Sequence, residues 1–163
     1  MALFQTIFHP TDFGEPSKEA FRVARSLAQA LGARVVVFHV LSSSWYLSPN
    51  GDGRVWHPKG ASRDLWAEYR NLQTDTPKVP VEYAVVQEEG NKHEAKHTLK
   101  EKIRELGEDV LVVMGTHGRT GIRRLLWRNT VEKVIRNSLC SVLVVKSPVP
   151  TVETTAPSRP HPG

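Results

Sequence analysis

The segment from Asp109 to Lys146 constrains the fold more than any other part of the sequence. An apolar run, Val110 to Met114, leads into a basic loop with three glycines, and the chain then becomes helix-like from about Thr130 to Ser138. A second apolar run, Val142 to Val145, follows. Strand, loop, helix and strand in this order form a βαβ unit. In such a unit the loop lies at the carboxyl edge of the sheet, where small residues let a ligand approach the backbone.

The rest of the sequence continues this alternation. We expect further strands at Gln5–His9, Val35–Leu41 and Val81–Gln87, and helices at Ser17–Leu31, Ser62 to about Gln73 and Gly90 to Leu106. Strands that are apolar on both faces and alternate with helices are typical of parallel sheets. The predicted fold class is therefore α/β, a five-stranded parallel open sheet with helices on both faces. Ser17 is the expected N-cap of the first helix, and Pro10 is expected to stop the first strand.

The composition favours one domain followed by a tail. We expect the domain to span residues 1–146, and residues 147–163, which are rich in proline and lack an apolar pattern, to be disordered. The segment from Ser42 to Ala61 is long for a connector and has two open interpretations. It is either a lid or partner surface, or a loop that aromatic residues attach to the domain. Asn50 and Gly51 could also close a small hairpin within it.

Length, charge and cysteine content limit the partners. The chain has 163 residues and a single cysteine, Cys140, which excludes an intramolecular disulfide and fits a reducing cytoplasm. Because no apolar run could span a membrane and no signal pattern opens the chain, we expect a cytoplasmic protein without a membrane partner. The net charge is +5, and the densest group of arginines lies in the glycine loop. Local anion binding is therefore favoured over a nucleic-acid footprint.

One motif suggests a metal site and is set aside. The segment from His93 to His97 matches the H-E-x-x-H pattern of zinc proteases, whose helix turns both histidines into a cleft. Here the apolar stripe of Ala95, Leu99 and Ile103 points away from both histidines at about 100° per residue. The histidines are therefore expected on the charged face, and we predict no metal site.

An acidic residue follows the first strand. Asp12 lies in the loop just after Pro10, and this loop shares the carboxyl edge of the predicted sheet with the glycine loop. A carboxylate in this position can accept hydrogen bonds from a ribose or a base. It can equally cap the loop or the next helix, and the sequence leaves both interpretations open.

Several motifs together resemble the universal stress protein family. They are Pro10 to Phe13, Phe38 to Val40, Met114 to Gly121 and the ending from Cys140 to Val145. The resemblance covers nearly all of residues 3 to 146, apart from the long loop. It implies a Rossmann-like fold of the adenine nucleotide alpha hydrolase type and a cytoplasmic stress-response module. It also implies a homodimer formed through the last strand, whose apolar edge would invite pairing with another chain.

The same resemblance implies an adenine-nucleotide site. Asp12 and Val40 would meet the adenosine half, Met114 and Gly115 would line the same pocket, and Gly118 would meet the phosphates. The candidate cofactor-binding residues are Pro10, Thr11, Asp12, Val40, Met114, Gly115, Gly118, Arg128, Asn129 and Thr130. The cofactor implied is ATP or another adenine nucleotide, with or without Mg²⁺.

The sequence departs from the family at the end of the glycine loop. The ATP-binding branch has the pattern G-x2-G-x9-G-[S/T], and here Arg128 and Asn129 stand in place of the last two residues. Arg128 could block the close approach that glycine allows, or it could itself bind phosphate. Asn129 is a competent N-cap for the helix that follows. Three functions stay open: a nucleotide-binding module, a dimeric interaction module without nucleotide, and a slow ATPase for which no positioned base or nucleophile is apparent.

Overall fold

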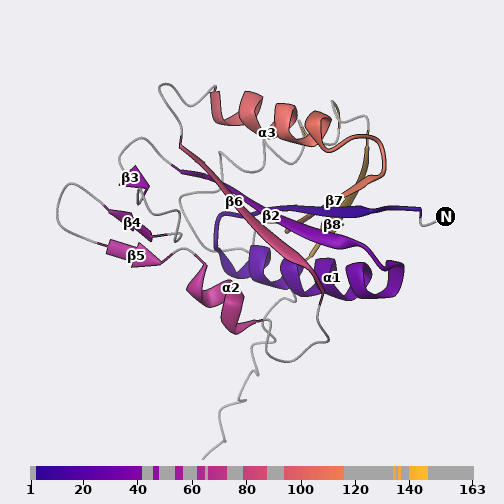
Figure 1. Ribbon diagram of the computed structural model, residues 1–163, viewed down its shortest axis with the longest axis horizontal. Helices are drawn as coiled ribbons and strands as arrows, with labels where there is room; N and C mark the ends of the chain where they lie inside the picture. Colours follow the sequence, from indigo (N-terminus) through magenta and orange to yellow (C-terminus); the bar gives the residue numbers. More distant parts are fainter. Residues whose placement is uncertain are drawn as a thin grey trace, which may run out of the picture.

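A parallel five-stranded sheet forms the centre of the molecule (Figure 1). The computed structural model describes residues 3–41, 46–47, 54–56, 62–64, 66–72, 79–87, 94–115, 134, 136 and 140–146. The strands of the sheet are β1 (Thr6–Pro10), β2 (Arg34–Leu41), β6 (Val81–Gln87), β7 (Val110–Gly115) and β8 (Ser141–Val145). Their order is β6-β2-β1-β7-β8, and every pair is parallel. The predicted α/β class and the five parallel strands are confirmed.

The strand order places a switch point beside β1. From β1 the chain adds β2 and then β6 on one side, and it returns to add β7 and β8 on the other. Phe8 of β1 is in register with Val36 of β2 and with Val112 of β7. The connections that leave β1 and β7 therefore diverge, and ligands bind at such points in open α/β sheets.

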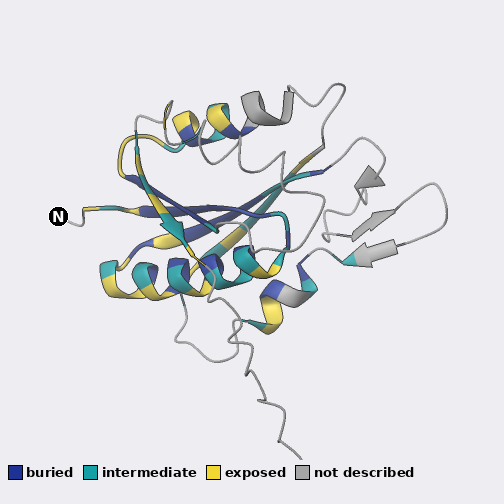
Figure 2. Cartoon of the chain, turned by 180° about the vertical axis from the view of Figure 1, so that it is seen from behind, coloured by how far each residue is buried: buried dark blue, intermediate teal, exposed yellow. Residues whose placement is uncertain are grey.

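Helices cover both faces of the sheet, as predicted. Helix α1 (Glu15–Leu31) packs on one face against a core that includes Ile7 and Val113, and α3 (Glu94–Glu105) lies over the other (Figure 1). Leu99 and Ile103 of α3 are buried there, as the predicted apolar stripe requires. Figure 2 shows the buried strands between helices whose outer surfaces are exposed. Residue His93 lies outside the described part of the chain, so the absence of a metal site there stays a prediction.

The start of α1 differs from the prediction. The N-cap is Gly14, and not Ser17, and the helix begins at Glu15 with a proline in its first turn. Proline is favoured there because its missing N–H would have no helical partner. The end is as expected, since Gly32 takes a left-handed conformation with φ of 66° and its N–H is directed to the carbonyl groups of the last turn. Pro10 is the last residue of β1 rather than the residue after it.

The middle of the chain forms a second, antiparallel sheet. Its strands β3 (Tyr46–Leu47), β4 (Arg54–Trp56) and β5 (Ser62–Asp64) lie beyond the carboxyl ends of the parallel strands (Figure 1). Strands β3 and β4 pair as the arms of a hairpin, while the Asn50–Gly51 turn predicted for it lies outside the described residues.

The predicted helix from Ser62 is wrong in its first part. Residues 62–64 form β5, and helix α2 is limited to Ala67–Asn71. Asp64 Oδ1 accepts hydrogen bonds from the backbone N–H groups of Trp66 and Ala67, at 3.0 and 3.1 Å. This carboxylate satisfies two of the free donors at the helix start, which sets the boundary.

Three further predicted features lie outside the described residues. They are the glycine loop after Gly115, the tail 147–163 and most of the helix from Thr130 to Ser138, of which only Val134 and Arg136 are described. Helices in the described part of the chain are all too short or too polar to cross a bilayer.

Candidate functional site

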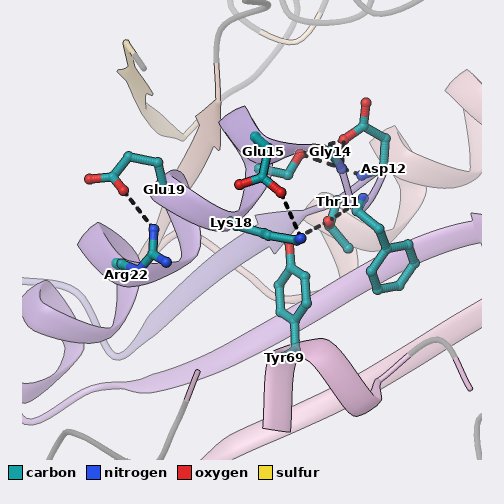
Figure 3. Close-up of polar contacts among 10 residues, drawn as sticks. Thr11, Asp12, Gly14, Glu15, Lys18, Glu19, Arg22 and Tyr69 are labelled. Atoms are coloured by element: carbon teal, nitrogen blue, oxygen red, sulfur yellow. Dashed lines mark hydrogen bonds and ion pairs between the residues drawn. The ribbon is translucent and has the colours of Figure 1, made fainter. Parts of the chain in front are cut away.

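The turn that leaves β1 is held by its own side chains (Figure 3). Thr11 Oγ1 accepts a hydrogen bond from the backbone N–H of Phe13, at 2.9 Å. Asp12 Oδ1 accepts one from the N–H of Gly14, at 2.9 Å, and another from the Ser17 hydroxyl, at 2.6 Å. Two side chain–backbone turns therefore follow each other directly. Between them Phe13 is forced to a φ of 62°, which residues with a Cβ rarely adopt.

The two oxygens of Asp12 have different surroundings. Oδ1 accepts the bonds that hold the turn and the Ser17 hydroxyl in the first turn of α1, whereas Oδ2 has no hydrogen-bond partner among the described residues. The side chain is half-buried. Capping, one of the two interpretations from the sequence, is therefore observed for one oxygen, and the other oxygen keeps its full acceptor capacity.

A buried chain of hydrogen bonds connects this turn to β7 and to α2. His9 Nδ1 lies 2.9 Å from the Val113 carbonyl oxygen, and His9 Nε2 lies 3.2 Å from the Tyr69 hydroxyl. The Tyr69 hydroxyl also lies 2.5 Å from Thr11 Oγ1. All three side chains are fully buried.

The groups at the two ends of this series of hydrogen bonds determine which atom is the donor in each bond. A carbonyl oxygen only accepts, so His9 Nδ1 donates to Val113, and in a neutral imidazole Nε2 must then accept from Tyr69. With its proton committed to His9, the Tyr69 oxygen accepts from the Thr11 hydroxyl. The Thr11 oxygen in turn accepts from Phe13 N–H. The direction of each hydrogen bond from the Phe13 N–H to the Val113 carbonyl is therefore defined.

The pKa of His9 supports this assignment. Burial lowers it from 6.5 to about 4, although the hydrogen bond to the Val113 carbonyl and the charge of Asp12 both act to raise it. His9 is therefore neutral at pH 7, and its Nε2 is an acceptor.

Gly115 lies at the end of β7, directly against the start of α1. A Cβ at this position would be 2.3 Å from the Pro16 carbonyl oxygen and 3.0 Å from Ser17 N. Its φ is not in the left-handed region, so the requirement for glycine is one of close approach. The close contact brings the first residue of the glycine loop next to the first turn of α1, whose Ser17 hydroxyl bonds Asp12.

The other candidate residues divide into two groups. Pro10, Thr11 and Met114 are buried, and Val40 is half-buried against the core on the α3 side. Because the first three have almost no exposed side-chain surface, they can act on a ligand only through the backbone or by positioning Asp12. The candidates in the second group, Gly118, Arg128, Asn129 and Thr130, lie outside the described residues, so their roles stay predictions.

Sequence reasoning missed His9, Tyr69, Phe13 and Ser17 as parts of this site. The sequence places His9 only at the end of a predicted strand, and Tyr69 only within the helix expected from Ser62 to about Gln73. Their contact joins residues 60 positions apart, and no spacing rule indicates such a pair. The one available signal was the placement of a histidine immediately before the Pro-Thr-Asp turn.

Fold and site together define the class of protein. A doubly wound parallel sheet with an acidic turn and a closely packed glycine at its switch point is a Rossmann-like α/β protein. The model of the universal stress protein family matches residues 3–146. The chain therefore belongs to the universal stress protein family, as its motifs suggested.

Known relatives agree with this assignment. One universal stress protein of Methanocaldococcus jannaschii is 31% identical over 147 residues, which cover 90% of this chain and 84% of the relative. A second from the same organism is 24% identical over 155 residues and covers 88% and 96%. Among solved structures, a universal stress protein from Lactobacillus plantarum aligns with a TM-score of 0.62 at 20% identity, over 87% of this chain and 97% of the other. Another, a universal stress protein in complex with cAMP, aligns with a TM-score of 0.60 at 20% identity, over 88% and 97%.

Proposed function

We propose that this protein binds ATP or another adenine nucleotide at the carboxyl edge of the sheet and acts as a nucleotide-binding stress-response module. The observation that carries the proposal is the Asp12 carboxylate, whose Oδ1 is fixed by Gly14 and Ser17 while Oδ2 stays open. A preoriented acceptor at a switch point suits a ligand with several hydroxyl or amino donors. The cAMP complex of a similarly folded family member supports the choice of an adenine nucleotide.

Charge suggests which part of the nucleotide would lie near Asp12. Asp12 and Glu15 place two carboxylates at the start of α1, and among the described residues only Glu15 has a cationic partner there, Lys18 at 2.7 Å. Phosphate oxygens would therefore be repelled at Asp12. Ribose hydroxyls or the adenine amino group would instead donate to Asp12 Oδ2. The phosphates are then expected at the basic glycine loop, with Gly118, Arg128, Asn129 and Thr130, because its arginines and the following helix start favour anions.

Equilibrium dialysis with labelled ATP, ADP, AMP and cAMP tests the proposal. We expect saturable uptake of at least one of them at or below millimolar concentration. Asp12→Asn keeps an acceptor for the turn but presents an amide donor to the ligand, so affinity should fall about tenfold or more, about 1.4 kcal/mol. Asp109→Asn is the matched control, because it removes the same charge at the amino end of β7. No uptake by the wild type, or equal losses in both variants, would contradict the proposal.

The replacement at Arg128 and Asn129 favours a second candidate function, an interaction module of the same fold without nucleotide. The double variant Arg128→Gly with Asn129→Ser restores the family pattern. If only this variant takes up ATP, the wild type is the nucleotide-free module. If the wild type binds more tightly than this variant, Arg128 acts as a phosphate ligand, and equal affinities would mean that Arg128 leaves the site open. Phosphate release by the wild type above a buffer blank would favour the slow ATPase.

We also propose that two copies pair through β8. This strand lies at one edge of the sheet, pairs in the described chain with β7, and carries Leu143 with 37% of its surface exposed. An apolar edge strand is a template for pairing with a second chain. Light scattering should give a dimer for the wild type and a monomer for Leu143→Lys. Leu3→Lys, at a more exposed position outside β8, should leave the dimer intact, and a monomeric wild type would exclude this pairing.

A further inference from the structure

Tyr69 is the point at which α2 meets β1 and the Asp12 turn. It is fully buried, and its hydroxyl contacts Thr11 Oγ1 at 2.5 Å and His9 Nε2 at 3.2 Å. Its ring lies 5.4 Å from that of Phe13 and 4.5 Å from that of Phe21 on α1. Figure 3 shows the ring extending from α2, with the hydroxyl directed toward Thr11.

The strained backbone conformation of Phe13 depends on contacts with the same region. Phe13, at a φ of 62°, is buried between the rings of His39, Trp66 and Tyr69, at centroid distances of 4.7, 5.3 and 5.4 Å. Trp66 and Tyr69 both belong to the α2 region. A left-handed conformation persists in a residue with a Cβ only where its surroundings hold it. The docking of α2 therefore holds Phe13, and Phe13 is the residue next to Asp12.

We propose that Tyr69 is a positioning residue for the ligand site: through Thr11 and Phe13 it holds the Asp12 turn in its ligand-accepting form, so that ligand binding and the docking of α2 stabilise each other. The inference rests on the proposed function for its ligand and adds an element that regulates the same site. Coupling of this kind is reciprocal. A change that loosens the docking of α2 lowers the affinity for the ligand, and ligand binding in turn stabilises the docked α2.

The antiparallel sheet is connected to the start of α2. Asp64 of β5 caps α2 through Trp66 N–H and Ala67 N–H, and it also forms an ion pair with Arg70. At the other end of α2, Arg25 of α1 donates a hydrogen bond to the Leu72 carbonyl, at 2.5 Å. A partner that displaces the antiparallel sheet would therefore act on α2, and through Tyr69 on Asp12.

Amide exchange without ligand tests the positioning role. Tyr69→Phe keeps the ring and removes only the hydroxyl, and Tyr83→Phe removes a hydroxyl from a ring that packs on Trp66 instead. We expect exchange at the amides of Phe13 and Gly14 to become about tenfold faster in Tyr69→Phe, as the loss of about one hydrogen bond implies. The amide of Phe8 in β1 serves as an internal reference. Asp64→Ala, which leaves the buried chain intact, should have a smaller effect in the same direction. Unchanged exchange at Phe13 and Gly14 in both Tyr69→Phe and Asp64→Ala would overturn the inference.

Titration with ATP tests the coupling. Tyr69→Phe should raise the dissociation constant about fivefold to tenfold, and Tyr83→Phe should leave it unchanged. Because Tyr69 acts through the Thr11 hydroxyl, the Tyr69→Phe effect should disappear in a Thr11→Val background. ATP should also slow exchange at the Arg70 amide, which bonds the Trp66 carbonyl at 2.8 Å, in the wild type but not in Tyr69→Phe.

The outcomes separate this inference from the proposed function. If Tyr69 had a merely structural role, the effects of Tyr69→Phe and Thr11→Val on the dissociation constant would be additive. ATP would then also protect the Arg70 amide in both the wild type and Tyr69→Phe. This result would overturn the inference. If the wild type takes up no adenine nucleotide, the proposed function is wrong, and exchange at Phe13 and Gly14 alone decides whether Tyr69 orders the turn.

Discussion

Gly115→Ala is the substitution whose effect the structure determines most directly. The added Cβ would lie 2.3 Å from the carbonyl oxygen and 2.5 Å from the carbonyl carbon of Pro16, and 3.0 Å from Ser17 N. Carbon atoms pack at about 3.5–4.0 Å, so β7 and the start of α1 must separate by about 1 Å. All three opposing atoms belong to the backbone, so no side-chain rotation relieves the contact.

The size of the effect follows from comparison with Gly32. Overpacking costs about 1–3 kcal/mol, and a contact between two backbones should reach the upper end, about 3 kcal/mol. At Gly32, with φ of 66°, an added Cβ meets nothing within 4 Å, so alanine there suffers only conformational strain. That strain is about 1–2 kcal/mol, and the reduced entropy of the unfolded chain offsets part of it. Gly115→Ala should therefore cost about 2 kcal/mol more than Gly32→Ala.

Urea unfolding followed by circular dichroism measures both variants. With a slope of about 2 kcal/mol per molar, the midpoint should fall by about 1.5 M for Gly115→Ala and about 0.5 M for Gly32→Ala. Chevron kinetics on the same samples would show whether the contact forms before or after the transition state. If Gly115→Ala is no less stable than Gly32→Ala, close approach is not the reason for glycine at this position.

Two further predictions concern the buried chain and α2. The folded pKa of His9 is lowered to about 4 from 6.5, so its contribution to stability is complete above pH 6.5 and is lost as pH falls toward 4, about 3 kcal/mol in total. Urea unfolding between pH 7 and pH 4.5 should therefore show a steeper loss for the wild type than for His9→Gln, and equal slopes would contradict a neutral His9. Asp64→Ala removes the acceptor for two amides of α2 and should cost about 1 kcal/mol in the same assay, whereas Glu82→Ala, which removes an exposed ion pair with Arg34, should cost less than about 0.5 kcal/mol.

The strands of the parallel sheet were predictable because each is marked by a short run of neighbouring residues in the sequence. The predicted bounds of β6, Val81–Gln87, coincide with the observed ones, since Pro80 precedes the strand and a short apolar run fills it. The order of the strands does not follow from such runs. It depends on which side of β1 the chain returns to, and that is decided by the packing of α1 and α3 on opposite faces.

The middle segment could not be predicted in the same way. Strands of two or three residues, such as β3 and β5, are too short to show a period. The helix expected from Ser62 to about Gln73 contains the observed α2, Ala67–Asn71, but it begins too early. A helix of this length gains little from propensity alone, so its bounds depend on Asp64 and on the burial of Tyr69.

The candidate site shows where residue-level interpretation reaches its limit. Capping and ligand binding were posed as alternatives for Asp12, but a carboxylate has two oxygens. The bonds of Oδ1 to Gly14 and Ser17 fix the rotamer, and fixing the rotamer is what aims Oδ2. Capping therefore lowers the entropy that a ligand would otherwise have to remove, and the capped turn is the better receptor. The same logic applies to Thr11, which has no exposed surface yet decides through Tyr69 and Phe13 where that second oxygen points.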